Sequence, residues 1–103
     1  MFNLHITLMT MSWTRVKNVN GSGRYLPPYG YASWLDYWEK QTGKKVNVCG
    51  ASGCNGTDLV GAHVQKANSY DNRWYVTPLC RTCNNRTDEF DVYFDLVPVP
   101  SNL

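Results

Sequence analysis

The sequence lacks any apolar run close to the roughly 20 residues of a membrane-spanning helix, so we expect no membrane association. Its first ten residues, MFNLHITLMT, have neither a basic start nor a small-residue cleavage site. We therefore expect no signal peptide and a cytoplasmic, reducing location, where structural disulfides are rare. Charged residues make up only 17% of the chain, against 43% hydrophobic and 14% aromatic residues. This balance excludes a disordered chain and predicts a folded one.

The net charge of +2 is unevenly distributed along the chain. Residues 1–57 carry six basic and two acidic side chains, which gives +4, while residues 58–103 carry four basic and six acidic ones, which gives −2. Such an asymmetry permits a basic face for a nucleic acid or an acidic protein, although exposed charges are often only solvated. The candidate phosphate contacts are Arg15, Lys17, Arg24, Lys44, Lys45, Arg73 and Arg86.

With 103 residues the chain is predicted to form one small domain over residues 1–103, of a size that often needs a metal or disulfides to supplement its core. Residues 1–11 are interpreted as a disordered extension. Residues 12–45 are expected to be an irregular aromatic segment followed by a helix. Residues 12–32 are rich in Gly, Pro, Asn and Tyr, which favours turns over regular structure.

Residues 33–42 form the clearest predicted helix. Ser33 suits the N-cap, Asp36 follows three residues later, and Gly43 suits the position after the last turn. Trp34 and Trp38 recur at helical spacing with Tyr37, which gives the helix an aromatic face. Such a face packs against a core or serves as a stacking platform for bases.

Residues 46–96 are predicted to form a compact module of a cysteine turn, a hairpin and a helix. A short strand enters a Gly-rich cysteine turn, and strands over 59–64 and 73–78 form a hairpin. A helix is predicted over 80–90, and the alternating segment that follows, DVYFDLV, is predicted as an edge strand ended by Pro98 and Pro100. The order of knuckle, hairpin and helix predicts an α+β treble clef, with the helix 33–42 and the C-terminal edge strand as additions.

The four cysteines lie in two close pairs, Cys49 with Cys54 and Cys80 with Cys83, separated by 25 residues. The spacing C-x4-C…C-x2-C lets each pair grip one ion from a turn, as a tetrahedral structural Zn2+ site requires. A site with four cysteine ligands leaves no open position for catalysis. Disulfides and an iron–sulfur cluster are the alternatives.

The segments GAHV (Gly61–Val64) and PLCRTCNNR (Pro78–Arg86) resemble the HNH, or His-Me finger, endonucleases over about residues 46–88. The resemblance implies that His63 is the general base of phosphodiester hydrolysis, with Asn84 as a ligand of a catalytic Mg2+ or Mn2+ ion. Without catalysis, His63 would be a hydrogen-bonded core histidine.

The chain departs from the HNH pattern at two positions. Ala62 stands where a second metal ligand is common, and Tyr75 stands where an Asn usually orients the base. Asp88, one turn after Asn84, and Asp58 are the candidate replacement carboxylates. Asn72 is the nearest candidate for the orienting Asn.

Three functions remain open from the sequence. The first is a degenerate HNH-like zinc module that binds a nucleic acid or a nucleic-acid-processing protein without turnover, as a phage or mobile-element accessory protein or an inhibitor of a defence nuclease would. The second is a small metal-dependent HNH endonuclease. The third is a purely structural protein-interaction domain. The salt dependence of nucleic-acid binding separates the first from the third.

Overall fold

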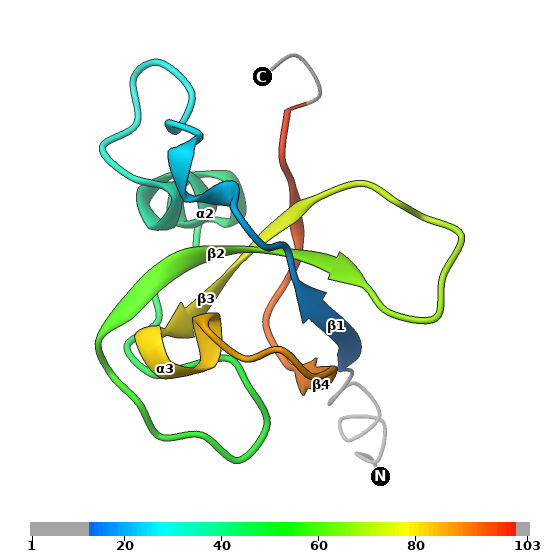
Figure 1. Ribbon diagram of the computed structural model, residues 1–103. Coiled ribbons are helices and arrows are strands. Elements are labelled where there is room, and N and C mark those ends of the chain that lie inside the picture. Colours follow the sequence, from blue (N-terminus) through cyan, green and yellow to red (C-terminus); the bar gives the residue numbers. More distant parts are fainter. Residues whose placement is uncertain (1–12, 101–103) are drawn as a thin grey trace, which may run out of the picture.

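A computed structural model describes residues 13–100, in which five strands form one antiparallel sheet (Figure 1). The predicted extension over residues 1–11 lies outside the described residues. The strand order across the sheet is β4-β1-β2-β3-β5. The elements are β1 (Thr14–Asn18), the short helix η1 (Ser22–Arg24), α2 (Trp34–Thr42), β2 (Leu59–Lys66), β3 (Tyr75–Cys80), α3 (Arg81–Asn84), β4 (Phe90–Val92) and β5 (Val97–Pro98).

The centre of the sheet is the predicted hairpin, which consists of β2 and β3. Its register runs from Leu59 opposite Cys80 to Val64 opposite Tyr75. The two strands lie within two residues of the predicted ranges, because their β-branched and aromatic residues carried a clear signal. All six residues of β3 are buried, so this strand lies inside the protein with packing on both faces.

The prediction of irregular backbone over residues 12–32 is wrong at Thr14–Asn18, which form β1 between β2 and β4. Only Val16 of this strand is buried, and its neighbours are polar. A strand with a single inward apolar side chain leaves almost no alternation in the sequence. Its conformation is set by pairing with strands distant in the chain.

Helix α2 confirms the predicted helix together with both of its ends. The Ser33 hydroxyl accepts a hydrogen bond from the backbone N–H of Asp36 at 2.9 Å, as an N-cap should. Gly43 adopts φ 72°, and its N–H bonds to the carbonyl of Glu39. Lys40 lies 2.6 Å from the Asp36 carboxylate one turn earlier. The local sequence therefore fixes where this helix begins and ends.

The predicted helix over 80–90 is wrong in its length, because α3 contains only Arg81–Asn84. The Asn18 side-chain amide donates to the carbonyls of Cys83 and Arg86, at 3.0 and 2.9 Å. The Cys83 carbonyl also accepts from the N–H of Arg86 in the closing turn, so both carbonyls are satisfied without further helical turns. The chain can then leave α3 and pair as β4 with β1.

Two further strand predictions need correction. No strand forms in the segment before Cys49, where the nearest pairing is an isolated bridge between Ala51 and Val92. The single predicted edge strand at the C-terminus is instead two short strands, and β4 and β5 lie at opposite edges of the sheet. Between them Phe94 packs on Trp38, whose indole N–H donates to the carbonyl of Asp95.

The two faces of the sheet carry different cores. Because side chains alternate along a strand, Ala62 and Val64 share one face of β2 and pack in the cluster that contains the buried cysteines. Gly61 and His63 point to the other face, which α2 covers. A Cβ on Gly61 would lie 2.4 Å from backbone atoms of Trp34 and Leu35, so this glycine permits the close approach of α2.

Candidate functional site

The first candidate site is the cluster of the four cysteine side chains. One potential ligand atom from each lies within 4.8 Å of the others, and Cys54 Sγ is 3.7 Å from Cys80 Sγ. A zinc tetrahedron with Zn–S bonds of about 2.3 Å has sulfur–sulfur edges of about 3.8 Å. All four cysteines are free, and 3.7 Å is far beyond a disulfide bond. The cluster therefore has the chemistry and dimensions to hold a metal ion.

Local backbone geometry brings the first cysteine pair into position. Cys49 N–H bonds to the carbonyl of Gly56 at 2.8 Å, which closes the turn around Cys54. Backbone N–H groups point at both sulfurs of the pair, from Ala51 to Cys49 and from Gly56 to Cys54. A Cβ on Gly56 would lie 2.7 Å from Cys80 Sγ, so only glycine fits there. Gly56 therefore allows the turn to close against the second pair.

The electrostatics of the cluster also fit a cation. Burial raises the pKa of the Cys49 thiol and raises that of Cys83 to about 12, whereas the N–H of Gly56 lowers the pKa of Cys54. Without a cation the Cys49 and Cys83 thiols are therefore neutral at pH 7. A bound divalent ion compensates the charge of the thiolates and displaces their protons.

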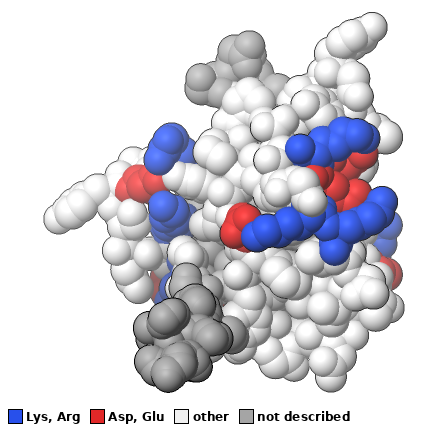
Figure 2. All heavy atoms as spheres, turned by 180° about the vertical axis from the view of Figure 1, so that it is seen from behind, with Lys and Arg blue, Asp and Glu red and all other residues white. Residues whose placement is uncertain are grey.

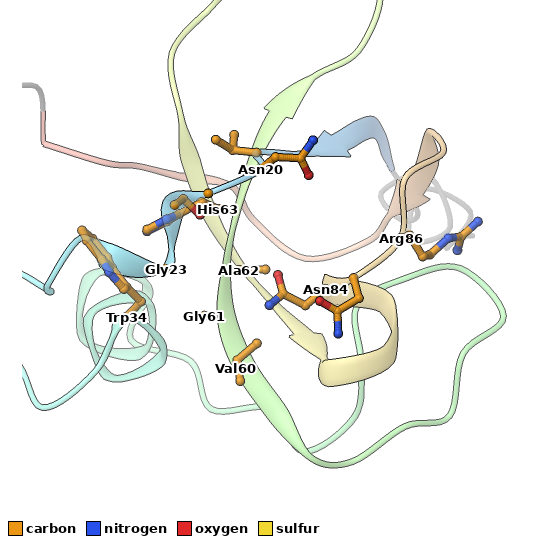
Figure 3. Close-up of a pocket in the computed structure, with 13 residues that line it drawn as sticks. Asn20, Gly23, Trp34, Val60, Gly61, Ala62, His63, Asn84 and Arg86 are labelled. Atoms are coloured by element: carbon orange, nitrogen blue, oxygen red, sulfur yellow. The ribbon is translucent and has the colours of Figure 1, made fainter.

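The second candidate site is a cavity of about 340 Å3 along the edge of β2 (Figure 3). It is bounded by the segment between β1 and η1, by Trp34 of α2, by β2, and by the end of α3. The lining residues are Val19, Asn20, Gly21, Ser22, Gly23, Trp34, Val60, Gly61, Ala62, His63, Asn84, Asn85 and Arg86. Among the described residues, therefore, the cavity is rich in amide groups and contains no carboxylate.

His63 lines this cavity and is only 5% exposed. Its ring lies against two indoles, 4.5 Å from Trp34 and 5.8 Å from Trp74 between centroids. Its buried Nε2 has no hydrogen-bond partner within the part of the chain that the structure describes. Burial lowers the pKa of the imidazole below its usual 6.5, so His63 is neutral at pH 7. It can accept a proton or bind a ligand there.

The structure brings His63 and Asn84 to the same cavity, from opposite sides of β2 (Figure 3). His63 reaches toward Trp34, whereas Ala62 points toward Asn84 on α3. Asp88 lies outside the cavity lining, and its carboxylate forms an ion pair of 2.6 Å with Arg86. The predicted base and amide ligand are thus together, without the predicted carboxylate.

The other residues considered for the missing HNH positions also lie outside the cavity. Asp58 is exposed and lies 3.8 Å from the Arg81 guanidinium. Tyr75 is buried, and its hydroxyl donates to Asp71 in the loop between β2 and β3. The backbone carbonyl of Asn72 accepts from Gln65 in the same loop. None of these residues lines the cavity within the described chain.

The predicted phosphate contacts are spread over the surface rather than gathered in one patch. Five of the seven form ion pairs, and Figure 2 shows basic side chains next to acidic ones on the face that it presents. The pairs are Arg15–Asp91, Lys44–Asp95, Lys45–Glu39, Arg73–Asp71 and Arg86–Asp88. Within the described residues, Lys17 and Arg24 have no carboxylate partner, which leaves them as the better phosphate contacts.

The aromatic face of α2 belongs mainly to the core. Trp38 is fully buried and Tyr37 nearly so, and both pack with Val76 of β3. Trp34 is half-buried between Tyr37 and His63. The aromatic side chains that remain exposed lie elsewhere, including Tyr29 and Tyr70. A stacking platform on α2 is thereby reduced to the exposed part of Trp34.

Sequence reasoning missed the N-terminal wall of the cavity. Asn20 and the glycines at 21 and 23 were expected only to form turns, yet they line the cavity opposite α3. The signal in the sequence is the glycine at position 21. Its φ of 74° in the structure shows that the turn there requires glycine. Their place next to β2 follows from β1, and the sequence did not reveal that strand.

No family model, curated protein or solved structure matches this chain. No helix among the described residues is long and apolar enough to cross a membrane. Fold and site define a small α+β protein with one antiparallel sheet and a four-cysteine cluster that could hold a metal ion.

Proposed function

We propose that this protein is a zinc-stabilised, treble-clef binding module that recognises nucleic acid without cleaving it. The observation that carries the proposal is the pairing of two sites on one hairpin. The cysteine cluster connects the turn at Cys49 to the end of β3 and the start of α3. The amide-rich cavity lies on the opposite edge of β2, away from β3. A metal at the first site would hold the second in shape.

The identity of the metal is argued from its ligands. Four thiolates whose sulfurs lie within 4.8 Å of one another suit Zn2+, which has no redox chemistry and binds in such closed sites as a structural element. The chain order of cysteine turn, hairpin and short helix supports a treble clef. The same order and the motif around His63 support a degenerate relationship to the HNH endonucleases.

The cavity favours binding over catalysis. Single-ion hydrolysis of a phosphodiester needs a well-held divalent cation, and Mg2+ binds mainly through carboxylates and water. The cavity offers a neutral imidazole, amides and a hydroxyl, with Arg86 as its charged residue among those described. Arg86 is paired with Asp88 at 2.6 Å, so the described lining offers neither a carboxylate for Mg2+ nor an unpaired cation. These groups fit a hydrogen-bonding ligand such as a nucleobase better than a metal cation.

Exposed aromatic and basic groups support a nucleic acid as the ligand. Trp13 and Tyr93 form a pair with centroids 5.3 Å apart, and they are 55% and 37% exposed. Tyr29 is fully exposed in the segment before α2. Bases stack on such rings with little sequence preference, and cationic side chains such as Lys17 contact the backbone.

The test is a titration of the zinc-loaded protein with labelled single-stranded and double-stranded DNA and RNA at several salt concentrations. We expect binding that weakens linearly on a log–log plot against salt, because phosphate contacts release counterions. Absence of binding to all four nucleic acids at low salt contradicts the proposal. A protein-interaction domain would then be the better account.

The second candidate function is a metal-dependent HNH endonuclease. It is favoured by one observation, that His63 is neutral and shares a cavity with Asn84. It predicts nicking of supercoiled plasmid in Mg2+ or Mn2+ that disappears in His63→Ala and in the bulkier His63→Phe. If the wild-type protein leaves plasmid intact across divalent metals, this function is excluded.

A further inference from the structure

The edge of β2 facing the cavity offers backbone groups that no strand covers. Pairing of β1 with β2 ends at Asn18 opposite Val64, and Val19 N–H then bonds to the carbonyl of His63. Residues two apart in a strand point their N–H and C=O the same way, so those of Gly61 point to the same side as those of His63. Gly61 lines the cavity. Its backbone therefore presents one donor and one acceptor to a ligand.

The side chains around this edge supply a matching set of polar groups. Asn20, Asn84 and Asn85 carry amides, each of which contains donors and an acceptor. The edge of a nucleobase presents donors and acceptors side by side, and an asparagine amide can bind such a pair with two hydrogen bonds. A cavity of about 340 Å3 falls within the range of sites that bind small molecules.

A second observation indicates that a ligand belongs here. His63 is nine-tenths buried and lines the cavity, yet its Nε2 lacks a partner among the described residues. Buried polar atoms in native proteins are normally paired, because an unpaired one costs the hydrogen bond that it would make with water. A polar ligand in the cavity would supply the missing partner.

The polar groups of the lining select the class of ligand. Arg86 is the charged lining residue among those described, but its guanidinium is fixed by two hydrogen bonds to Asp88, from Nε at 2.9 Å and Nη2 at 2.6 Å. It also lies over the Phe90 ring and points away from Asn84 in Figure 3, so a ligand in the cavity is held by neutral groups. A peptide strand could also pair with Gly61, but the lining provides few apolar surfaces for its side chains. A nucleobase matches the amides and the Gly61 edge.

We propose that the cavity takes one unstacked base of a nucleic-acid strand, with its edge bound by the Asn84 amide and the Gly61 backbone. This inference rests on the proposed nucleic-acid binding and adds where a base is recognised. It predicts a preference for single strands, because a base inside a duplex cannot reach the edge of β2.

The experiment follows the backbone amide of Gly61 by NMR in the zinc-loaded protein. The probes are the four nucleoside 5′-monophosphates, ribose 5-phosphate, and short single-stranded oligonucleotides. We expect nucleotides to shift the Gly61 amide and ribose 5-phosphate to leave it unmoved. Asn84→Leu should weaken oligonucleotide binding by about tenfold or more. Asn47→Leu, at an exposed position outside the cavity lining, should not.

The outcomes separate this inference from the proposed function. If oligonucleotides bind equally well to wild type and Asn84→Leu, and the Gly61 amide does not move, the cavity is not the base site although the nucleic-acid function stands. If oligonucleotides do not bind but mononucleotides shift Gly61, the cavity is a free-nucleotide site. If neither binds, both proposals fail. Asn84→Asp, which keeps the size of the side chain and removes the amide donor, repeats the test if Asn84→Leu does not fold.

Discussion

The imidazole of His63 meets the indole of Trp34 edge to face, with centroids 4.5 Å apart and planes inclined by 79°. Trp74 lies 5.8 Å away. The histidine is thus held in an aromatic setting on the α2 face of β2, where its buried Nε2 lacks a partner among the described residues. Packing accounts for its place in the fold but leaves Nε2 unpaired, and the ligand that we propose would supply its partner.

Replacing His63 by phenylalanine should change stability little. A phenyl ring can occupy the space beside Trp34 and removes a buried nitrogen without a partner, so we expect a change within about 1 kcal/mol and in the stabilising direction. His63→Ala should cost about 2–4 kcal/mol, because it leaves a cavity. Urea denaturation of the zinc-loaded proteins measures both. A loss from His63→Phe as large as that from His63→Ala would show that the imidazole makes hydrogen bonds the structure does not contain.

The same histidine should make stability depend on pH. Burial lowers the pKa of His63 in the folded state, so the unfolded chain binds the proton at higher pH than the folded one. The contribution of the neutral imidazole to the free energy of unfolding is therefore present above about pH 6.5 and is lost as the pH falls below that value.

Thermal melts of wild type and His63→Phe at pH values between about 7.5 and 5.5 measure this effect as a difference. The wild type should lose more stability on acidification. Protonation of the cysteines affects both proteins alike, so it cancels in the comparison. Parallel pH profiles would mean that His63 is not desolvated in the folded state.

The contact between α2 and β2 depends on Gly61. Gly61→Ala would place a Cβ 2.4 Å from backbone atoms that cannot move without shifting the start of α2, so we expect a loss of about 1–3 kcal/mol or more. Gly23→Ala is the matched control, because a Cβ there meets nothing within 4 Å. It should change stability by less than about 0.5 kcal/mol. Equal melting temperatures for the two variants would contradict the packing of α2 on β2.

Replacing single lysines by alanine should distinguish a lysine that binds phosphate from one that is held in an ion pair. Lys17→Ala should weaken nucleic-acid binding for every sequence and reduce the salt slope by about one, if its ammonium contacts a phosphate. Lys44→Ala should do neither, because Lys44 lies 2.9 Å from the Asp95 carboxylate. Fluorescence anisotropy with one single-stranded oligonucleotide measures both. A larger effect of Lys44 than of Lys17 would place the binding face near the end of α2 instead.

The parts of the fold that the sequence predicted are those with strong local signals. The helix from Trp34 to Thr42 carried its own cap at Ser33 and its own stop at Gly43. The grouping of the cysteines followed from their spacing, and the structure confirms that they lie together. The hairpin followed from two runs of strand-forming residues.

The parts that could not be predicted depend on distant contacts. β1 has one buried apolar side chain, so its strand forms through pairing with residues more than 40 positions away. The early end of α3 depends on the Asn18 side chain, which comes from that same strand. Missing β1 also concealed the N-terminal wall of the cavity. The sequence showed His63 and Asn84, but not the groups that surround them.

The most direct test of the account is the metal content and folding of the protein purified without added metal. We predict one zinc ion per chain by elemental analysis and native mass spectrometry. Chelation or Cys80→Ser should remove it and with it the cooperative melt, because metal binding and folding are one equilibrium in such small modules. A metal-free protein that melts cooperatively at the same temperature as the wild type would contradict the account.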